Sequence, residues 1–70
     1  MLPSMEELAY IVPDISCDHC VRAIEGEVSL VEGVDSVTAD VETKRVVVRG
    51  VGLDDTAIRA AIDEAGYTPA

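Results

Sequence analysis

The chain has 70 residues, of which 49% are hydrophobic, enough for the core of one small domain. Asp and Glu number 14 against 5 Lys and Arg, and the formal charge of −9 disfavours binding to nucleic acids and to anionic membranes. No apolar run approaches the ~18 residues of a membrane-spanning helix, and the N-terminus carries Glu6 and Glu7 where a signal peptide is basic. We therefore expect one cytoplasmic domain over residues 1–70, without membrane insertion, in which residues 1–7 form a loose lead-in.

The first half of the chain predicts a strand followed by a helix. Apolar side chains alternate at Leu8, Tyr10 and Val12, which indicates a strand over residues 8–12 that ends before Pro13. The spacing of apolar residues then changes to three and four, which predicts an amphipathic helix over residues 18–31. The stripe that this helix is expected to bury consists of Val21, Ile24, Val28 and Val31.

The second half predicts a hairpin, a helix and a short last strand. Val-rich segments over residues 34–41 and 45–49 flank a turn at residues 42–44. A second helix follows, for which Asp54 or Asp55 suits the N-cap and Gly66 suits the residue after the last turn. Residues 67–70 leave room for one more strand, which Pro69 restricts to a sheet edge. The second helix is expected to bury Ile58, Ala61, Ile62 and Ala65.

The predicted order of elements is βαββαβ, which consists of two βαβ halves. Each half needs a right-handed crossover between its strands. The economical result is an α+β, ferredoxin-like sandwich with a four-stranded antiparallel sheet and two helices on one face.

The two cysteines form a single CxxC motif, Cys17-Asp18-His19-Cys20. A structural disulfide between them would close too short a loop to constrain the unfolded chain much, and the cytoplasm would tend to reduce it. One CxxC also supplies two ligands where a closed structural zinc site needs four. The motif therefore indicates a redox dithiol, a two-thiolate site for a soft metal, or half of a site between two molecules.

The position of the motif favours thiolate chemistry. Cys17 is expected in the loop after the first strand, and Cys20 in the first turn of the following helix. The unpaired N–H groups and the dipole at a helix start lower the pKa of a thiol. Sulfurs at positions i and i+3 can converge on one ion, and soft thiolates select Cu(I) over hard ions. The alternative is a pair of half-buried cysteines with no ligand.

The segment Val-Pro-Asp-Ile-Ser-Cys-Asp-His-Cys-Val, residues 12–21, resembles the metal-binding loop of the heavy-metal-associated domain family. Gly33-Val34 and the Ala-Gly-Tyr at residues 65–67 extend the resemblance across residues 8–67. The resemblance implies a bacterial copper chaperone or the N-terminal metal-binding domain of a copper-transporting P-type ATPase. Such a domain carries one Cu(I) per chain on Cys17 and Cys20 and passes it to a partner's CxxC by ligand exchange, without being an enzyme.

Two residues depart from the family loop, which usually reads Gly-Met-x-Cys-x-x-Cys. Asp14 replaces the Gly, and Ile15 replaces a Met that anchors the loop in the core. Ile is apolar and of similar size, so it can still anchor the loop. Zinc-preferring relatives usually carry a carboxylate immediately before the first Cys, and Ser16 at that position favours copper.

Two further residues are auxiliary candidates beside the metal. His19 lies between the cysteines, so we expect it to point away from the ion; it is a third ligand, a ligand across a metal-bridged homodimer, a group that tunes the thiols, or a solvated residue. By the resemblance, Tyr67 lies in a loop beside the site, where its hydroxyl would bond to a sulfur or its ring would close the core.

Three functions remain in competition. The first is Cu(I) delivery to a copper-transporting P-type ATPase. The second is zinc or mercury binding by a domain of the same family. The third belongs to another class, a small thiol-disulfide oxidoreductase, whose CxxC also begins a helix but in a longer chain.

Overall fold

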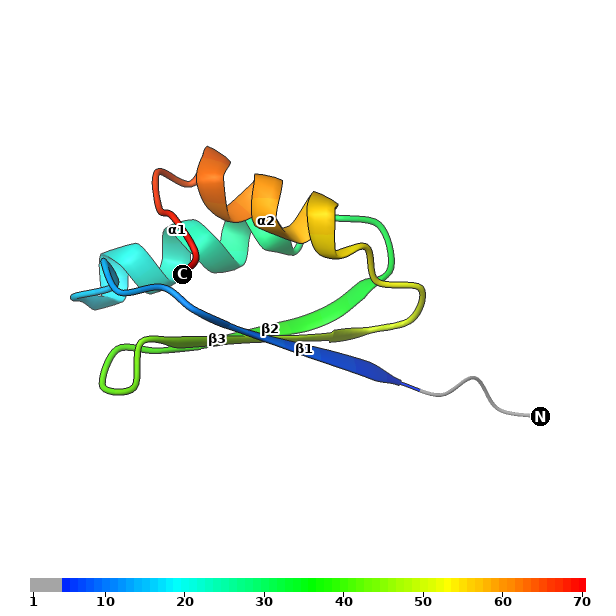
Figure 1. Ribbon diagram of the computed structural model, residues 1–70, viewed down its shortest axis with the longest axis horizontal. Coiled ribbons are helices and arrows are strands. Elements are labelled where there is room, and N and C mark those ends of the chain that lie inside the picture. Colours follow the sequence, from blue (N-terminus) through cyan, green and yellow to red (C-terminus); the bar gives the residue numbers. More distant parts are fainter. Residues whose placement is uncertain (1–4) are drawn as a thin grey trace.

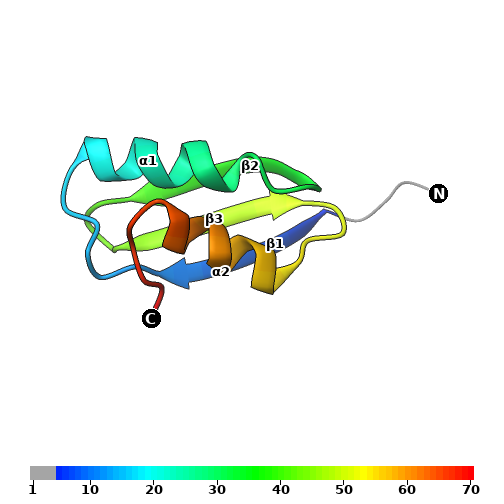
Figure 2. The ribbon, with the colours of Figure 1, turned by 90° about the horizontal axis from the view of Figure 1, so that it is seen from above.

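The computed structural model describes residues 5–70 and shows two layers, a sheet and a pair of helices. Both helices lie side by side on one face of the sheet (Figures 1 and 2). The elements in chain order are β1 (Glu6–Ile11), α1 (Asp18–Val28), β2 (Val34–Asp40), β3 (Arg45–Gly50) and α2 (Asp55–Glu64).

The sheet is antiparallel, with β3 between the other two strands in the order β1-β3-β2. Leu8 of β1 and Val37 of β2 both pair with Val48 of β3, so these three side chains share the face under the helices. Strand alternation thus places one row of apolar residues in the core, as the sequence predicts.

The core lies between this face and the apolar stripes of the helices. Val46 and Val48 of β3 are fully buried, as is Ile24 of α1. Ile58 and Ile62 of α2 are fully buried too, at the spacing of one helical turn. On the two helices, the predicted stripes face the core: Ile24, Val28, Ile58, Ala61 and Ile62 are buried, and Val21, Val31 and Ala65 are partly buried against them.

The caps that begin and end α2 are those expected from the sequence. The Asp54 side chain accepts hydrogen bonds from the backbone N–H groups of Thr56 and Ala57. At the other end Gly66 takes a φ of +95°, and the N–H of Tyr67 donates to the carbonyl of Ile62. This Schellman ending fixes the direction in which the chain leaves α2.

Five boundaries differ by one to three residues from the predictions: both ends of β1 and the last residues of α1, β2 and β3. β1 begins at Glu6, inside the predicted lead-in, because the Glu6 side chain accepts bonds from the N–H groups of Gly52 and Leu53. Residues 1–4 of the predicted lead-in lie outside the described residues. β2 ends at Asp40, one residue early, because the Asp40 carboxylate starts the turn by accepting from the N–H of Glu42.

α1 ends at Val28, three residues before its predicted end. The position of Gly33 accounts for this early end. Gly33 lies beside the end of β3, where its carbonyl accepts a hydrogen bond from the N–H of Val51 at 2.9 Å, and the chain must leave the helix to reach that place. A side chain on Gly33 would lie 2.4 Å from the Val51 carbonyl oxygen, and its φ of +90° suits glycine. The chain therefore leaves the helix early, and Leu30 is 79% exposed.

The predicted fourth strand is not present in the described part of the chain, where the sheet has three strands. Residues 67–70 lie beside the end of β1 but make one backbone bond to it, from the N–H of Ala70 to the carbonyl of Ile11 at 2.7 Å. Pro69 has no N–H to donate, so a regular ladder does not form over this short segment. The fold is α+β with a three-stranded antiparallel sheet.

Within residues 5–70, neither helix is long and apolar enough to cross a membrane.

Candidate metal centre

The two cysteines lie where β1 leads into α1, at one end of the molecule (Figure 1). Cys17 is the N-cap of α1 in an extended conformation, and Cys20 lies in the first helical turn. The carbonyl of Cys17 accepts from the N–H groups of Cys20 and Val21 at 3.1 and 3.2 Å. These backbone bonds fix the cysteines relative to each other, because they form the first turn of the helix.

The two sulfur atoms are 3.6 Å apart, and both residues are free thiols. This separation is far longer than a disulfide bond of about 2.05 Å, yet short enough for both sulfurs to contact one ion between them. Cys17 is exposed and Cys20 is 8% exposed. The pair therefore combines one solvent-exposed cysteine with one that is mostly covered by protein.

The surroundings of Cys20 stabilise its thiolate. A hydrogen bond from the Tyr67 hydroxyl is the largest cause, and the backbone N–H of Ser16 donates as well; together they lower the pKa of Cys20 to about 6. Burial acts in the opposite direction, whereas contacts from the Cys17 thiol and the Ser16 hydroxyl, 3.9 Å away, lower the pKa further. Cys20 is therefore mostly ionised at neutral pH, the form that binds metals.

Tyr67 reaches Cys20 because of the way α2 ends. The Schellman ending directs the chain back toward the start of α1, and Tyr67 is half-buried there. The same contact raises the pKa of Tyr67, since ionising its hydroxyl would remove the bond to Cys20 and place two negative charges together. Tyr67 is thus the neighbour with the largest effect on the pKa of Cys20.

Ile15 holds the loop from the inside. Its side chain is fully buried in the core, and its N–H donates to the carbonyl of Val12 at 3.2 Å. This burial is what a residue that anchors the loop in the core requires. Ser16 follows it on the surface, beside Cys20.

His19 is exposed on the first turn of α1. In the described part of the chain, no three side chains of the types His, Cys, Asp and Glu gather where they would hold one ion. The arrangement therefore offers two sulfur ligands from one chain.

Lys44, in the turn between β2 and β3, contacts the loop, although it was not among the predicted site residues. Its ammonium group donates to the carbonyl of Ile15, and its own carbonyl accepts from the N–H of Val12. The sequence alone does not predict this contact, because Lys44 and Ile15 are 29 positions apart and only the folded sheet brings the turn to the loop.

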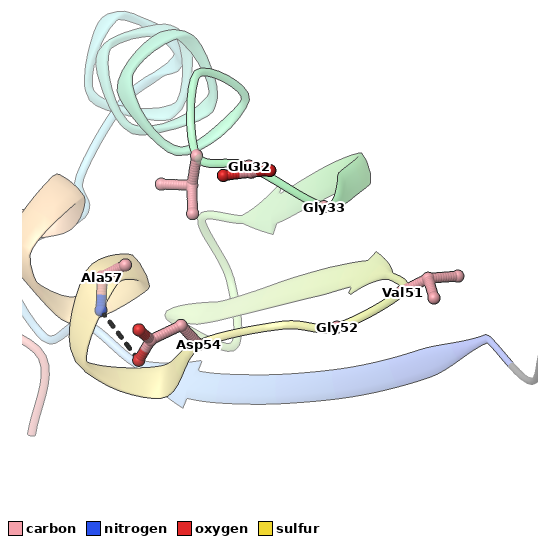
Figure 3. A pocket seen from close by; sticks show the side chains of 7 residues that line it. Glu32, Gly33, Val51, Gly52, Asp54 and Ala57 are labelled. Atoms are coloured by element: carbon pink, nitrogen blue, oxygen red, sulfur yellow. Dashed lines mark hydrogen bonds between the residues drawn. The ribbon is translucent and has the colours of Figure 1, made fainter.

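A cleft of about 490 Å³ lies at the other end of the molecule, where α1 leads to β2 and β3 leads to α2 (Figures 1 and 3). The Asp54 carboxylate on its wall already accepts the N–H of Ala57 as the cap of α2. The cleft contains none of the predicted site residues. It is lined by Val31, Glu32, Gly33, Val51, Gly52, Asp54 and Ala57.

The sequence model of one protein family matches most of the chain, over residues 9–68, and that family is described as the heavy-metal-associated domain. The chain belongs to this family. The residues matched include the second half of β1, both helices and the CxxC motif, so the family covers the whole of the candidate site.

Relatives of two kinds align with this heavy-metal-associated domain. The COP-associated protein of Helicobacter pylori strain J99 is 42% identical over 59 residues, which cover 84% of this chain and 85% of the relative. The copper chaperone CopZ of Bacillus subtilis is 36% identical over 67 residues, covering 90% and 94%. Copper-transporting ATPase 1 of Rhizobium meliloti is 39% identical over 59 residues, covering 83% of this chain but 7% of the ATPase.

Solved structures show the same architecture. A CopZ metallochaperone superposes with a TM-score of 0.88 at 25% identity, covering 93% of this chain and all of the other. The apo form of CopP from Helicobacter pylori superposes with a TM-score of 0.84 at 35% identity, again covering 93% and 100%. The heavy-metal-associated domain therefore agrees with copper chaperones both in sequence and in fold.

Proposed function

We propose that this domain carries one Cu(I) ion on the sulfurs of Cys17 and Cys20 in the cytoplasm and delivers it to a CxxC domain of a copper-transporting P-type ATPase. The observation that carries the proposal is the pair of free thiols 3.6 Å apart at the start of α1, with the pKa of Cys20 lowered to about 6. Its relatives include proteins named as copper chaperones and copper-transporting ATPases.

The ligand set favours Cu(I) over Zn(II). Zinc usually takes four donors from Cys, His and carboxylate side chains, whereas two soft thiolates suit Cu(I). In the described residues no third side chain of those types joins the two sulfurs. Zinc and mercury remain the competing ions, and a metal competition decides among them.

The unequal exposure of the two cysteines supports delivery by ligand exchange. A thiolate of the partner approaches the ion on the side of the exposed Cys17 and forms a third copper–sulfur bond. Cys17 then leaves with its electron pair, while the covered Cys20 holds the ion until a second partner thiolate replaces it. Copper stays Cu(I) throughout, since no electron is transferred.

The charge of the domain suits a partner with a basic face. The formal charge of −9 would speed the encounter with Lys and Arg side chains, and salt would slow it over a Debye length of about 8–10 Å. The exposed Cys17 would also allow a second copy to share the ion, which gives a metal-bridged homodimer in the absence of the partner.

The test of delivery is to mix the Cu(I)-loaded domain with a CxxC domain of a copper ATPase and follow both by NMR. We expect the ion to move faster than it is lost to a small chelator at the same free copper concentration. A partner domain with both cysteines replaced by serine is the control and should receive nothing. Transfer no faster than loss to the chelator would contradict delivery.

A separate assay tests the enzyme alternative. The reduced domain is incubated with insulin and a dithiol reductant, and precipitation of the insulin chains is followed. We expect no turnover above the reductant alone, since the proposed role needs no electron transfer. Turnover that depends on Cys17 and Cys20 would favour an oxidoreductase instead.

A further inference from the structure

Lys44 has a backbone conformation that lysine seldom takes. It is the last residue of the turn between β2 and β3, and its φ is +62°. This left-handed region suits glycine or asparagine, and a longer side chain there raises the free energy of the folded state. A residue held in an unfavourable conformation beside a functional loop indicates that its side chain has a use there.

The Lys44 side chain lies against the metal-binding loop. The turn and the loop share one end of the molecule in both ribbon views (Figures 1 and 2). The Lys44 ammonium group donates to the carbonyl of Ile15, and the Lys44 carbonyl accepts from the N–H of Val12 at 2.7 Å. One residue of the hairpin thus contacts both ends of the segment that leads to Cys17.

The carbonyl that Lys44 contacts belongs to the same peptide unit as the N–H of Ser16. A trans peptide is planar, and its C=O and N–H point in opposite directions. Holding the carbonyl oxygen of Ile15 toward the hairpin therefore aims the N–H of Ser16 away from the hairpin. This N–H is one of the groups that lower the pKa of Cys20, whose sulfur also lies 3.9 Å from the Ser16 hydroxyl. A bond from an ammonium group also polarises the peptide and strengthens the donor at its other end.

We propose that Lys44 is a positioning residue, which fixes the peptide between Ile15 and Ser16 so that the Ser16 N–H stays directed at the sulfur of Cys20. Ile15 anchors this peptide through its buried side chain, and Lys44 anchors it from the outer side through its carbonyl. We also expect the domain to hold Cu(I) longer when this peptide is fixed, and that expectation rests on the function proposed above. The orientation of the peptide, in contrast, is a property of the metal-free protein.

The test compares four variants of the metal-free, reduced protein by amide hydrogen exchange. Lys44→Met removes the donor, Lys44→Arg keeps a cationic donor, and Lys44→Gly removes the side chain while fitting the backbone. Arg45→Met is the matched control, because Arg45 is the neighbouring cation, is exposed, and makes no side-chain hydrogen bond or ion pair within residues 5–70.

We expect the Ser16 amide to exchange about tenfold faster in Lys44→Met and Lys44→Gly, the change that follows from losing a charged hydrogen bond. Lys44→Arg should stay near the wild-type rate, and Arg45→Met should match it. Lys44→Gly should also unfold at the same or a higher urea concentration than wild type, since glycine takes the φ freely. If Lys44 only stabilised the fold, Lys44→Gly would show the opposite result. It would unfold at a lower urea concentration, and its Ser16 amide would exchange at the wild-type rate.

Unchanged exchange at Ser16 in Lys44→Gly would overturn the proposal, even if Lys44→Met failed to fold. A second measurement follows the loss of Cu(I) to a chelator, which should be faster in Lys44→Gly than in Arg45→Met. Equal loss from these two variants would overturn the consequence for retention. If wild-type protein bound no Cu(I), the proposed function would fail, while the exchange of Ser16 would still decide the role of Lys44.

Discussion

Replacing Tyr67 with Phe removes one hydroxyl and keeps the half-buried ring, so the substitution isolates the hydrogen bond to Cys20. This bond is the largest of the causes that lower the pKa of Cys20 from its ordinary 9.0 to about 6. Hydrogen bonds to charged groups commonly change a pKa by one to two units, so the pKa of Cys20 should rise to about 7 or 8 in Tyr67→Phe. The thiol of the variant would then be partly protonated at neutral pH.

The assay is the carbon-13 chemical shift of each cysteine Cβ, followed against pH in the reduced, metal-free protein. Tyr10→Phe is the matched control, because the Tyr10 hydroxyl donates to Asp55 at 2.6 Å and contributes nothing to the Cys20 environment. In Tyr10→Phe, the plot of the Cys20 Cβ chemical shift against pH should superpose on the wild-type plot. If Tyr67→Phe also superposed on wild type, the Tyr67 hydroxyl would not be what stabilises the thiolate.

Three further substitutions test other parts of the account. Ile15→Met should change the free energy of unfolding in urea by less than ~1.5 kcal/mol, as similar-volume apolar exchanges do, and should leave Cu(I) affinity unchanged; a sharp gain in affinity would make the position a ligand. His19→Ala should leave the Cu(I) affinity of the monomer intact in a chelator competition, since His19 is exposed. Between about pH 6 and pH 9 the free energy of unfolding under reducing conditions should rise with pH, because the unfolded chain holds the Cys20 proton up to 9.0 and the folded chain releases it near 6. Cys20→Ser should flatten that rise, and an equal rise in both proteins would contradict the lowered pKa.

Periodicity in the sequence was enough to predict the layered fold. The alternation at Leu8, Tyr10 and Val12 and the helical spacing at Ile58 and Ile62 predicted which faces are buried, and the structure buries them. Local signals also predicted the caps of α2, because an N-cap aspartate and a C-terminal glycine act within a few residues of themselves. The position of the CxxC at the start of a helix followed from the same local signals.

The remaining features depend on contacts between segments far apart in the chain. The low pKa of Cys20 was expected mainly from the start of the helix, but its largest cause is a hydroxyl 47 positions later, on Tyr67. The contact of Lys44 with Ile15 likewise joins a hairpin to a loop. The prediction of a fourth strand was not met for a different reason. The segment over residues 67–70 is short and Pro69 lacks an N–H, so it does not form a regular ladder with the edge of β1.

The central claim, that two thiolates of one chain bind Cu(I), is tested most directly by native mass spectrometry. Protein reduced under nitrogen is offered Cu(I) and Zn(II) together in stoichiometric amounts, beside a Cys20→Ser variant. The account predicts one copper ion on each wild-type chain and none retained by the variant, since a single thiolate binds far more weakly. Zinc in place of copper on the wild-type chain, or copper kept equally well by Cys20→Ser, would contradict it.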